Sequence, residues 1–185
     1  MKTTFSECYE SVTKQEEGGY CDKIGDRGGE TYRGIARNFE PNWKGWVLID
    51  QIKQNGISIP YNWTDGARLD ELAEEFLEEK YWIKPKIAFF DEILRLQIFD
   101  SYVNSGANTW GILRNAAGLN YWDKTVTDDL HNFHPSPKDF CEARKEYYIY
   151  ISTPTQEFPQ REKNKQFLSG WLLRAERVLQ MSISS

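Results

Sequence analysis

Glu17 is the residue of this sequence best suited to donate a proton. It is predicted to be the last residue of a helix, directly before Gly18-Gly19, where the negative end of the helix macrodipole disfavours the charged carboxylate and raises its pKa. Glu16 beside it adds a like charge, and Tyr20 can supply an apolar wall. A carboxylic acid kept protonated in this way is what the hydrolysis of a glycosidic bond requires of its general acid.

A second carboxylate and a hydroxyl follow on a glycine-rich loop. Asp26 lies nine residues after Glu17, and Thr31 lies five residues after Asp26. We expect the loop to fold back over the end of the helix, so that a second group supports the nucleophile or the oxocarbenium-like centre. The residue types alone leave another interpretation open, in which Glu17 is a solvated helix-end carboxylate and Asp26 is a turn residue that caps Gly28-Gly29.

The elements that must position these residues are predicted to be mainly helical. Thr4 and Glu7 form a capping box at the start of the first helix, and Gly18-Gly19 should end it. Residues 20–35 predict turns or a small hairpin. The remaining apolar periodicity predicts helices at 46–54, 65–81, 93–103, 109–117 and 137–150, and a final helix after Pro159. The 185 residues show no repeat or linker, so we expect a single compact unit.

Composition excludes several classes of function. The net charge is -5 and no Lys/Arg cluster lines one face, which argues against a nucleic-acid partner and against an anionic membrane surface. Cys8, Cys21 and Cys141 are an odd, widely spaced set, so reduced thiols are expected. No metal site is predicted, because His131 and His134 have no ligand set beside them. The aromatic content of 15% suits stacking on sugar rings as well as a thick core.

Two motifs resemble the opening signature of a known family. Glu17-Gly18-Gly19-Tyr20, followed by the run Asp26 to Ile35, is similar to the start of glycoside hydrolase family 108. These are bacterial and phage N-acetylmuramidases, and some of them are named secretion activators. Where relatives usually have Asp-Pro-Gly-Gly, this chain has Asp26-Arg27-Gly28-Gly29, which alters the stiffness of the loop. The spacing from Asp to Thr is also one residue shorter here than in phage-type lysozymes.

Further segments extend the resemblance along nearly the whole chain. Phe99-Asp100 with Asn104-Ser105-Gly106 resembles the start of the peptidoglycan-binding half of these proteins, and Phe167 to Arg174 resembles their closing helix. The resemblance implies a mainly α, lysozyme-like fold with a small β-hairpin beside the active-site cleft. It also implies a catalytic half at residues 1–82 and a helical half at 83–185 that resembles a peptidoglycan-binding region.

The resemblance further implies a muramidase that cleaves the β-1,4 bond between N-acetylmuramic acid and N-acetylglucosamine. Glu17 would be the general acid, Asp26 would stabilise the sugar cation or orient water, and Thr31 would position that water. No cofactor and no metal are expected. The partner would be the glycan strands of peptidoglycan, without nucleic acid or membrane insertion, and we expect a monomer. A visible signal peptide is absent, so the expected route is synthesis in the bacterial cytoplasm and action on the wall after release or export.

Five residues are candidates for substrate contacts. Asp100 and Asn104 lie one helical turn apart on an otherwise apolar helix, where they can face a cleft or form a buried pair that fixes helix packing. Tyr20 and Tyr32, like Trp63, can stack on sugars or belong to the core. Two other functions stay open: a lytic transglycosylase, which closes an anhydro ring without water, and a catalytically silent peptidoglycan-binding or secretion-associated protein that kept the fold.

Overall fold

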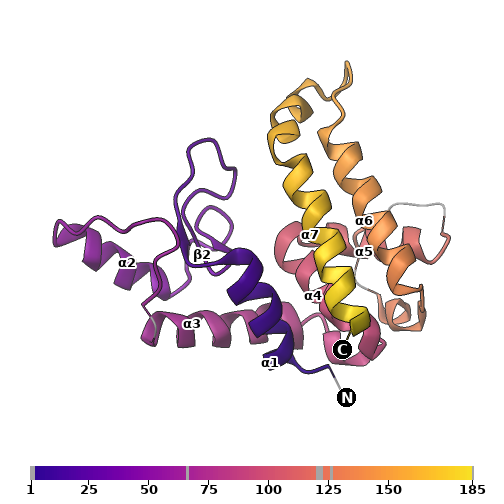
Figure 1. Cartoon of the computed structure of the whole chain (residues 1–185), viewed down its shortest axis with the longest axis horizontal. Coiled ribbons are helices and arrows are strands. Elements are labelled where there is room, and N and C mark those ends of the chain that lie inside the picture. Colours follow the sequence, from indigo (N-terminus) through magenta and orange to yellow (C-terminus); the bar gives the residue numbers. More distant parts are fainter. Residues whose placement is uncertain (1–2, 66, 120–122, 126, 185) are drawn as a thin grey trace. The chain divides into compact units, whose positions relative to one another are not determined.

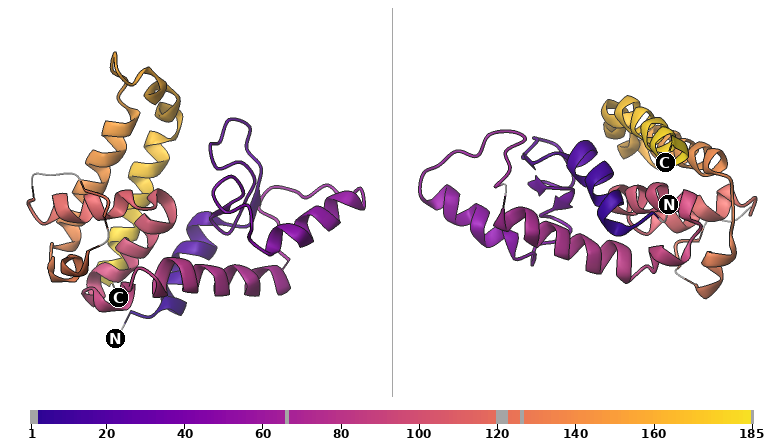
Figure 2. Two further views of the ribbon diagram at one scale, coloured as in Figure 1. Left: turned by 180° about the vertical axis from the view of Figure 1, so that it is seen from behind. Right: turned by 60° about the horizontal axis from the view of Figure 1, so that its bottom comes forward.

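A computed structural model describes residues 3–65, 67–119, 123–125 and 127–184, and for residues 14–17 and 128 it describes the backbone alone. The chain forms two compact units, one of Phe5–Pro85 and one of Lys86–Ser185, to which the few residues before Phe5 also belong. Figures 1 and 2 show the helices and strands of both units. In the described part of the chain, no helix is both long and apolar enough to span a membrane.

The first unit combines helices with a small antiparallel sheet. Its elements are α1 (Phe5–Cys8), η1 (Tyr9–Glu17), β1 (Tyr20–Cys21), β2 (Thr31–Tyr32), β3 (Ile35–Ala36), α2 (Gly45–Gln54), α3 (Arg68–Leu77) and η2 (Glu78–Ile83). The strands follow the order β1-β2-β3, with Tyr20 opposite Tyr32 and Tyr32 opposite Ile35. The hairpin expected at 20–35 and the first helix with its end at Gly18 are therefore confirmed.

The hairpin between β2 and β3 turns on two residues with positive φ, Arg33 at 49° and Gly34 at 81°. A two-residue loop of this kind matches the right-handed twist of the strands that it joins. Glycine adopts such a conformation freely, whereas Arg33 adopts it at a cost in backbone energy that other contacts must offset. The turn thereby fixes where the Arg33 side chain leaves the sheet.

Aromatic side chains fill the core of the first unit. Tyr32 stacks on Trp43 with ring centroids 5.9 Å apart, and Trp43 meets Trp46 edge-on at 4.9 Å. The Trp43 indole N–H donates to the backbone oxygen of Leu72, which fixes the ring against α3. In the first turn of α3, the Leu69 N–H donates to Asp65 Oδ2 at 3.0 Å, which satisfies one of the free backbone N–H groups at the start of the helix.

The second unit is a bundle of helices. It comprises η3 (Ile87–Phe89), α4 (Glu92–Ser105), α5 (Asn108–Ala116), η4 (Asp128–Asn132), α6 (Pro137–Ser152), η5 (Pro159–Asn164) and α7 (Lys165–Ser184). The long helices α6 and α7 run side by side in every view (Figures 1 and 2). Ser136 caps α6 by accepting the Asp139 N–H at 3.1 Å, directly before Pro137 in the first turn. The helices expected from periodicity in this half are confirmed.

Asp100 is the buried polar centre of this bundle. It lies on α4 with no exposed surface, and its carboxylate pairs with Arg144 of α6 and Arg174 of α7. Arg174 Nε and Nη2 both donate to Oδ1, at 2.9 and 2.6 Å. Burial by itself raises the pKa of Asp100, but the two guanidinium groups outweigh burial and hold that pKa below its usual value.

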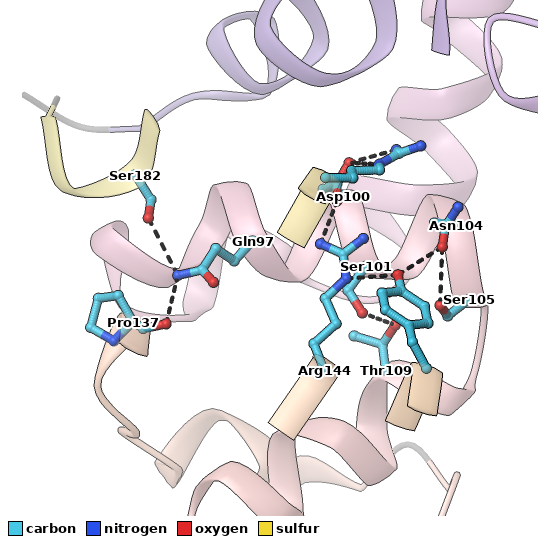
Figure 3. Close-up of polar contacts among 11 residues, drawn as sticks. Gln97, Asp100, Ser101, Asn104, Ser105, Thr109, Pro137, Arg144 and Ser182 are labelled. Atoms are coloured by element: carbon cyan, nitrogen blue, oxygen red, sulfur yellow. Dashed lines mark hydrogen bonds and ion pairs between the residues drawn. The ribbon is translucent and has the colours of Figure 1, made fainter. Parts of the chain in front are cut away.

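The network continues from Arg144 to the surface. Arg144 Nε donates to the Tyr148 hydroxyl at 2.8 Å, and that hydroxyl donates to Asn104 Oδ1 at 2.8 Å. Figure 3 labels Arg144 and Asn104, the two ends of this chain of hydrogen bonds. Asn104 itself is exposed. Three helices are therefore joined through one carboxylate, and the Asn104 amide closes the chain of hydrogen bonds at the surface.

Replacing Asp100 by Asn should destabilise the helical unit by about 3–5 kcal/mol, because two buried guanidinium groups lose their counter-charge. A carboxylate with a depressed pKa contributes stability above the unfolded pKa of about 4 and loses it as pH falls further. The Asp100→Asn protein should therefore also lose less stability than the wild type when pH is lowered from about 4 to 2. Chemical denaturation followed by circular dichroism measures both effects.

Glu176→Gln is the matched control, since it removes a carboxylate from a pair with Lys145 at the surface of the same bundle. Its effect should stay below about 1 kcal/mol. Equal unfolding midpoints for Asp100→Asn and Glu176→Gln would contradict the role assigned to the buried network.

Candidate functional site

The helix that carries Glu17 ends where the sequence predicts. η1 stops at Glu17, and Gly18 follows with a φ of 66°, a conformation that glycine adopts without strain. The Glu17 side chain lies outside the described part of the structure, which gives the position of its backbone. Glu17 thus occupies the carboxyl end of a helix, as the general-acid hypothesis requires.

Gly18 and Gly19 allow a neighbouring loop to lie directly against this helix end. A Cβ on Gly19 would stand 2.3 Å from the Trp63 backbone oxygen, and one on Gly18 would stand 2.4 Å from Asn62 Oδ1. The Gly19 N–H donates to Asn62 Oδ1 at 2.6 Å. Tyr20 exchanges two backbone hydrogen bonds of 2.7 Å with the same loop, its N–H to Trp63 O and its oxygen from Asn62 N–H. Side chains at the two glycine positions would push the loop away.

Arg33 fixes the same helix end from the hairpin side. Its Nη1 donates to Gly18 O at 3.1 Å, and its Nε and Nη2 form a fork with the two oxygens of Asp70, at 3.0 and 3.1 Å. The Tyr32 hydroxyl donates to Asp70 Oδ1 at 2.6 Å. The Arg33 and Asp70 side chains are only 9% and 19% exposed, so solvent screens this pair little. Sheet, α3 and the residue after Glu17 are thereby connected through one guanidinium group.

Asp26 and Thr31 make local contacts within the glycine-rich loop. Asp26 is exposed, and its Oδ1 accepts the Gly28 N–H at 2.8 Å. Thr31 lies in β2 opposite Cys21, and its hydroxyl donates to Gly29 O at 3.1 Å. The contact between Asp26 and Gly28 is the one expected if Asp26 is a turn residue that caps Gly28-Gly29. The catalytic roles of Asp26 and Thr31 remain predictions, because the contacts of the Glu17 carboxyl lie outside the described structure.

Glu30 is a polar centre that sequence reasoning missed. Its side chain is 11% exposed and accepts the Tyr20 hydroxyl at 2.5 Å, and it forms ion pairs with Arg37, 2.8 Å from Nε, and with Lys53. Burial and the hydrogen bond to Glu30 raise the pKa of Tyr20 to about 12. Lys53 comes from α2, and no local spacing in the sequence connects it with Glu30. The position of Glu30 directly before the predicted Thr31 was the only available signal.

The aromatic candidates for sugar contacts are largely enclosed by the protein. Tyr20 is 4% exposed and Tyr32 has no exposed surface, while Trp63 is half-buried. Burial and the hydrogen bond to Asp70 raise the pKa of Tyr32, so its hydroxyl stays protonated at neutral pH. Both tyrosines therefore serve as core residues whose hydroxyls hold carboxylates, and a contact of either with substrate remains a prediction.

Asp100 and Asn104 make the contacts expected of residues that fix helix packing, the second of the two roles considered for them. The Asp100 carboxylate is taken up by Arg144 and Arg174, and the Asn104 oxygen accepts from Tyr148. They belong to the unit of Lys86–Ser185, whereas Glu17 belongs to that of Phe5–Pro85. A role for either residue toward substrate also remains a prediction. Within the described residues, no group of three His, Cys, Asp or Glu side chains is arranged to hold a metal ion.

Comparison with known proteins decides the family. The signature of glycosyl hydrolase 108 matches residues 11–106, more than half of the chain. The chain belongs to glycosyl hydrolase family 108. A search of curated proteins gives no significant match. Among solved structures, the chain is similar to Brucella abortus SagA, with a TM-score of 0.64 and 20% identity over 97% of this chain and 94% of that one.

Membership of family 108 makes the chain a glycoside hydrolase by family, with a glycan as its class of substrate. The match covers the helix end at Glu17, the glycine-rich loop, and α4 as far as Gly106. The likeness to SagA extends over α5, α6 and α7 as well, and it confirms the mainly α, lysozyme-like fold expected from the sequence.

Asp70→Asn should lower the free energy of unfolding of the family 108 protein by about 2–4 kcal/mol, because Arg33 then keeps its charge without a counter-ion in a largely enclosed place. Hydrolytic activity should fall with it, because the Gly18 end of η1 loses its support. Urea unfolding followed by tryptophan fluorescence reports the change, since Trp43 and Trp46 lie in this core.

Asp50→Asn provides the control, because it makes the same chemical change in another bidentate pair. Asp50 accepts from Nη1 and Nη2 of Arg37, at 3.1 and 2.7 Å, but its side chain is 44% exposed. Its loss should cost less than about 1 kcal/mol. Unfolding of both variants at the same urea concentration would contradict the prediction that the buried Arg33–Asp70 pair contributes more to stability than the exposed Arg37–Asp50 pair.

Proposed function

We propose that the protein is a muramidase that hydrolyses the β-1,4 bond between N-acetylmuramic acid and N-acetylglucosamine in peptidoglycan, with Glu17 as general acid. The proposal rests on one observation, the set of hydrogen bonds that holds the residues directly after the C-terminal end of η1. There the residue after Glu17 is held by Arg33, and the next two residues are held by Asn62 and Trp63. Two independent supports on one helix end are what a preorganised catalytic acid needs.

Three of the other described carboxylates of the first unit that lie partly away from solvent have partners. Glu30 and Asp70 pair with cations, and Glu40 accepts from Lys80 and from the Tyr81 hydroxyl. Asp50, which is more exposed, has a pKa lowered by its hydrogen bonds to Arg37, the opposite of the shift that a general acid needs. Glu17, at the negative end of a helix, is the better proton donor.

The proposed reaction adds one water across the glycosidic bond. Glu17 donates its proton to the leaving oxygen as the carbon–oxygen bond breaks, and the water oxygen bonds to the sugar carbon that is left. The proton that this water releases restores the Glu17 carboxylic acid, directly or through solvent. Asp26 stabilises the positive charge on that sugar or orients the water, and Thr31 positions the water. The products are a reducing N-acetylmuramic acid end and a free hydroxyl on N-acetylglucosamine.

Glu17→Gln should reduce the clearing of peptidoglycan suspensions by a factor of about 10² to 10⁴, the usual contribution of a general acid. Glutamine keeps the shape of the side chain and removes its proton. Turbidity loss at equal protein concentration measures the rate, with circular dichroism to verify folding.

Glu16→Gln is the matched control, because it makes the same chemical change one residue earlier on η1 and leaves the proposed acid in place. Its rate should stay within a few-fold of the wild type. Equal activity of Glu17→Gln and wild type would refute the mechanism, and so would retention on sacculi without any cleavage by the wild type, which would indicate the silent binding protein.

The products should carry reducing ends. A lytic transglycosylase also needs one essential carboxylic acid, but it releases anhydro-muramyl ends and consumes no water. Mass spectrometry of digested peptidoglycan separates the two reactions, because anhydro products are lighter by one water. Reduction with borohydride should shift the muramidase products by the mass of two hydrogens, whereas anhydro-muramyl products that resist reduction would overturn the hydrolase assignment.

A further inference from the structure

The turn at residues 60–63 presents the most exposed aromatic side chain of the Phe5–Pro85 unit among the described residues. The turn is closed by a hydrogen bond of 3.2 Å from Trp63 N–H to Pro60 O, and Tyr61 at its corner is 82% exposed. Asn62 follows with a φ of 61°, a conformation that Asn tolerates better than most residues. A fully formed turn therefore holds a tyrosine ring in solvent.

This turn is attached to the helix end that carries Glu17. Asn62 Oδ1 accepts the Gly19 N–H at 2.6 Å, and Asn62 N–H donates to Tyr20 O at 2.7 Å. Covalent geometry then limits the Cα atoms of Glu17 and Tyr61 to a separation below about 20 Å, because each lies only one or two residues from the hydrogen-bonded pair. That span is within reach of a short glycan that also passes Glu17.

Asn62 adds oriented hydrogen-bond donors to the exposed ring. Because its Oδ1 accepts from Gly19, the orientation of the amide is fixed, and its Nδ2 carries two N–H groups. Nδ2 has no hydrogen-bond partner among the described residues, and Asn62 is exposed. An exposed aromatic ring one residue away from free amide donors suits an N-acetylated sugar, which offers an apolar C–H face and hydroxyl and acetamido oxygens.

We propose that Tyr61 and Asn62 form a glycan-binding contact, in which the Tyr61 ring stacks on an N-acetylated sugar and Asn62 Nδ2 donates to one of its oxygens. This inference rests on the proposed function, because the contact would bind the glycan strand whose glycosidic bond Glu17 cleaves. Tyr20 and Tyr32 lie in the core, and their hydroxyls hold Glu30 and Asp70. Tyr61 has the exposed ring that they lack.

Binding is measured on the Glu17→Gln protein, which separates affinity from turnover. The probe is a tetramer of N-acetylglucosamine, titrated by calorimetry. Adding Tyr61→Ala should weaken binding about five- to tenfold, the usual size of one aromatic stacking contact. Tyr61→Phe keeps the ring and should bind within about twofold of the parent.

Two further variants test the hydrogen-bond donors of Asn62 and provide a control for the loss of an exposed apolar side chain. Asn62→Asp keeps an oxygen for Gly19 N–H and tolerates the same backbone conformation, but it removes the donors and should also weaken binding. Ile57→Ala removes an apolar side chain that is 57% exposed on the same connection between α2 and α3, and it should leave affinity unchanged. On the active enzyme, Tyr61→Ala should raise KM more than it lowers kcat, as expected of binding shared by ground and transition states.

The outcomes distinguish this contact from the proposed function. Cleavage by the wild type together with unchanged affinity and KM in Tyr61→Ala overturns the contact and leaves the muramidase intact. Tetramer binding that depends on Tyr61, without any cleavage by the wild type, supports the contact and overturns the muramidase. Absence of both binding and cleavage overturns both.

Discussion

The Arg33–Asp70 ion pair is the interaction on which the candidate site depends most. Arg33 sits in a two-residue turn at a φ of 49°, and its fork onto Asp70 offsets the cost of that backbone conformation. The remaining guanidinium nitrogen reaches Gly18 O. A lysine would offer a point charge without the planar fork, so it could not hold Asp70 and the helix end in the same way. The hairpin, α3 and the end of η1 are consequently positioned as one assembly.

The helical unit uses the same chemistry for a different purpose. Asp100, Arg144 and Arg174 join α4, α6 and α7 through side chains that are all buried. The net charge of these three groups is positive, and such a network is costly to bury unless its geometry is specific. It therefore selects one packing of three helices over others, whereas apolar contacts such as those around Cys141, Ala175 and Leu179 supply the bulk of the packing.

Three supports converge on the few residues after Glu17, and each has a separate physical origin. Gly18 and Gly19 permit close approach because they lack Cβ atoms. Asn62 supplies a side-chain oxygen and a backbone N–H to the same segment. Arg33 adds a charge-assisted bond from the hairpin. Sterics, backbone pairing and electrostatics therefore all favour the same arrangement of the helix end, and the backbone that carries Tyr61 takes part in it.

The sequence by itself determined the features that depend on local rules. Apolar periodicity predicted α2, α4, α5, α6 and α7, Gly18-Gly19 predicted the end of the first helix, and the spacing around Glu17 led to the family. Only the tertiary structure decided which polar groups meet. Arg33 and Asp70 are 37 residues apart, and Asp100 and Arg174 are 74 apart, so no periodicity connects them. It also decided that Tyr20 and Tyr32 are buried while Tyr61 is exposed, because the burial of a ring depends on which distant segments pack over it.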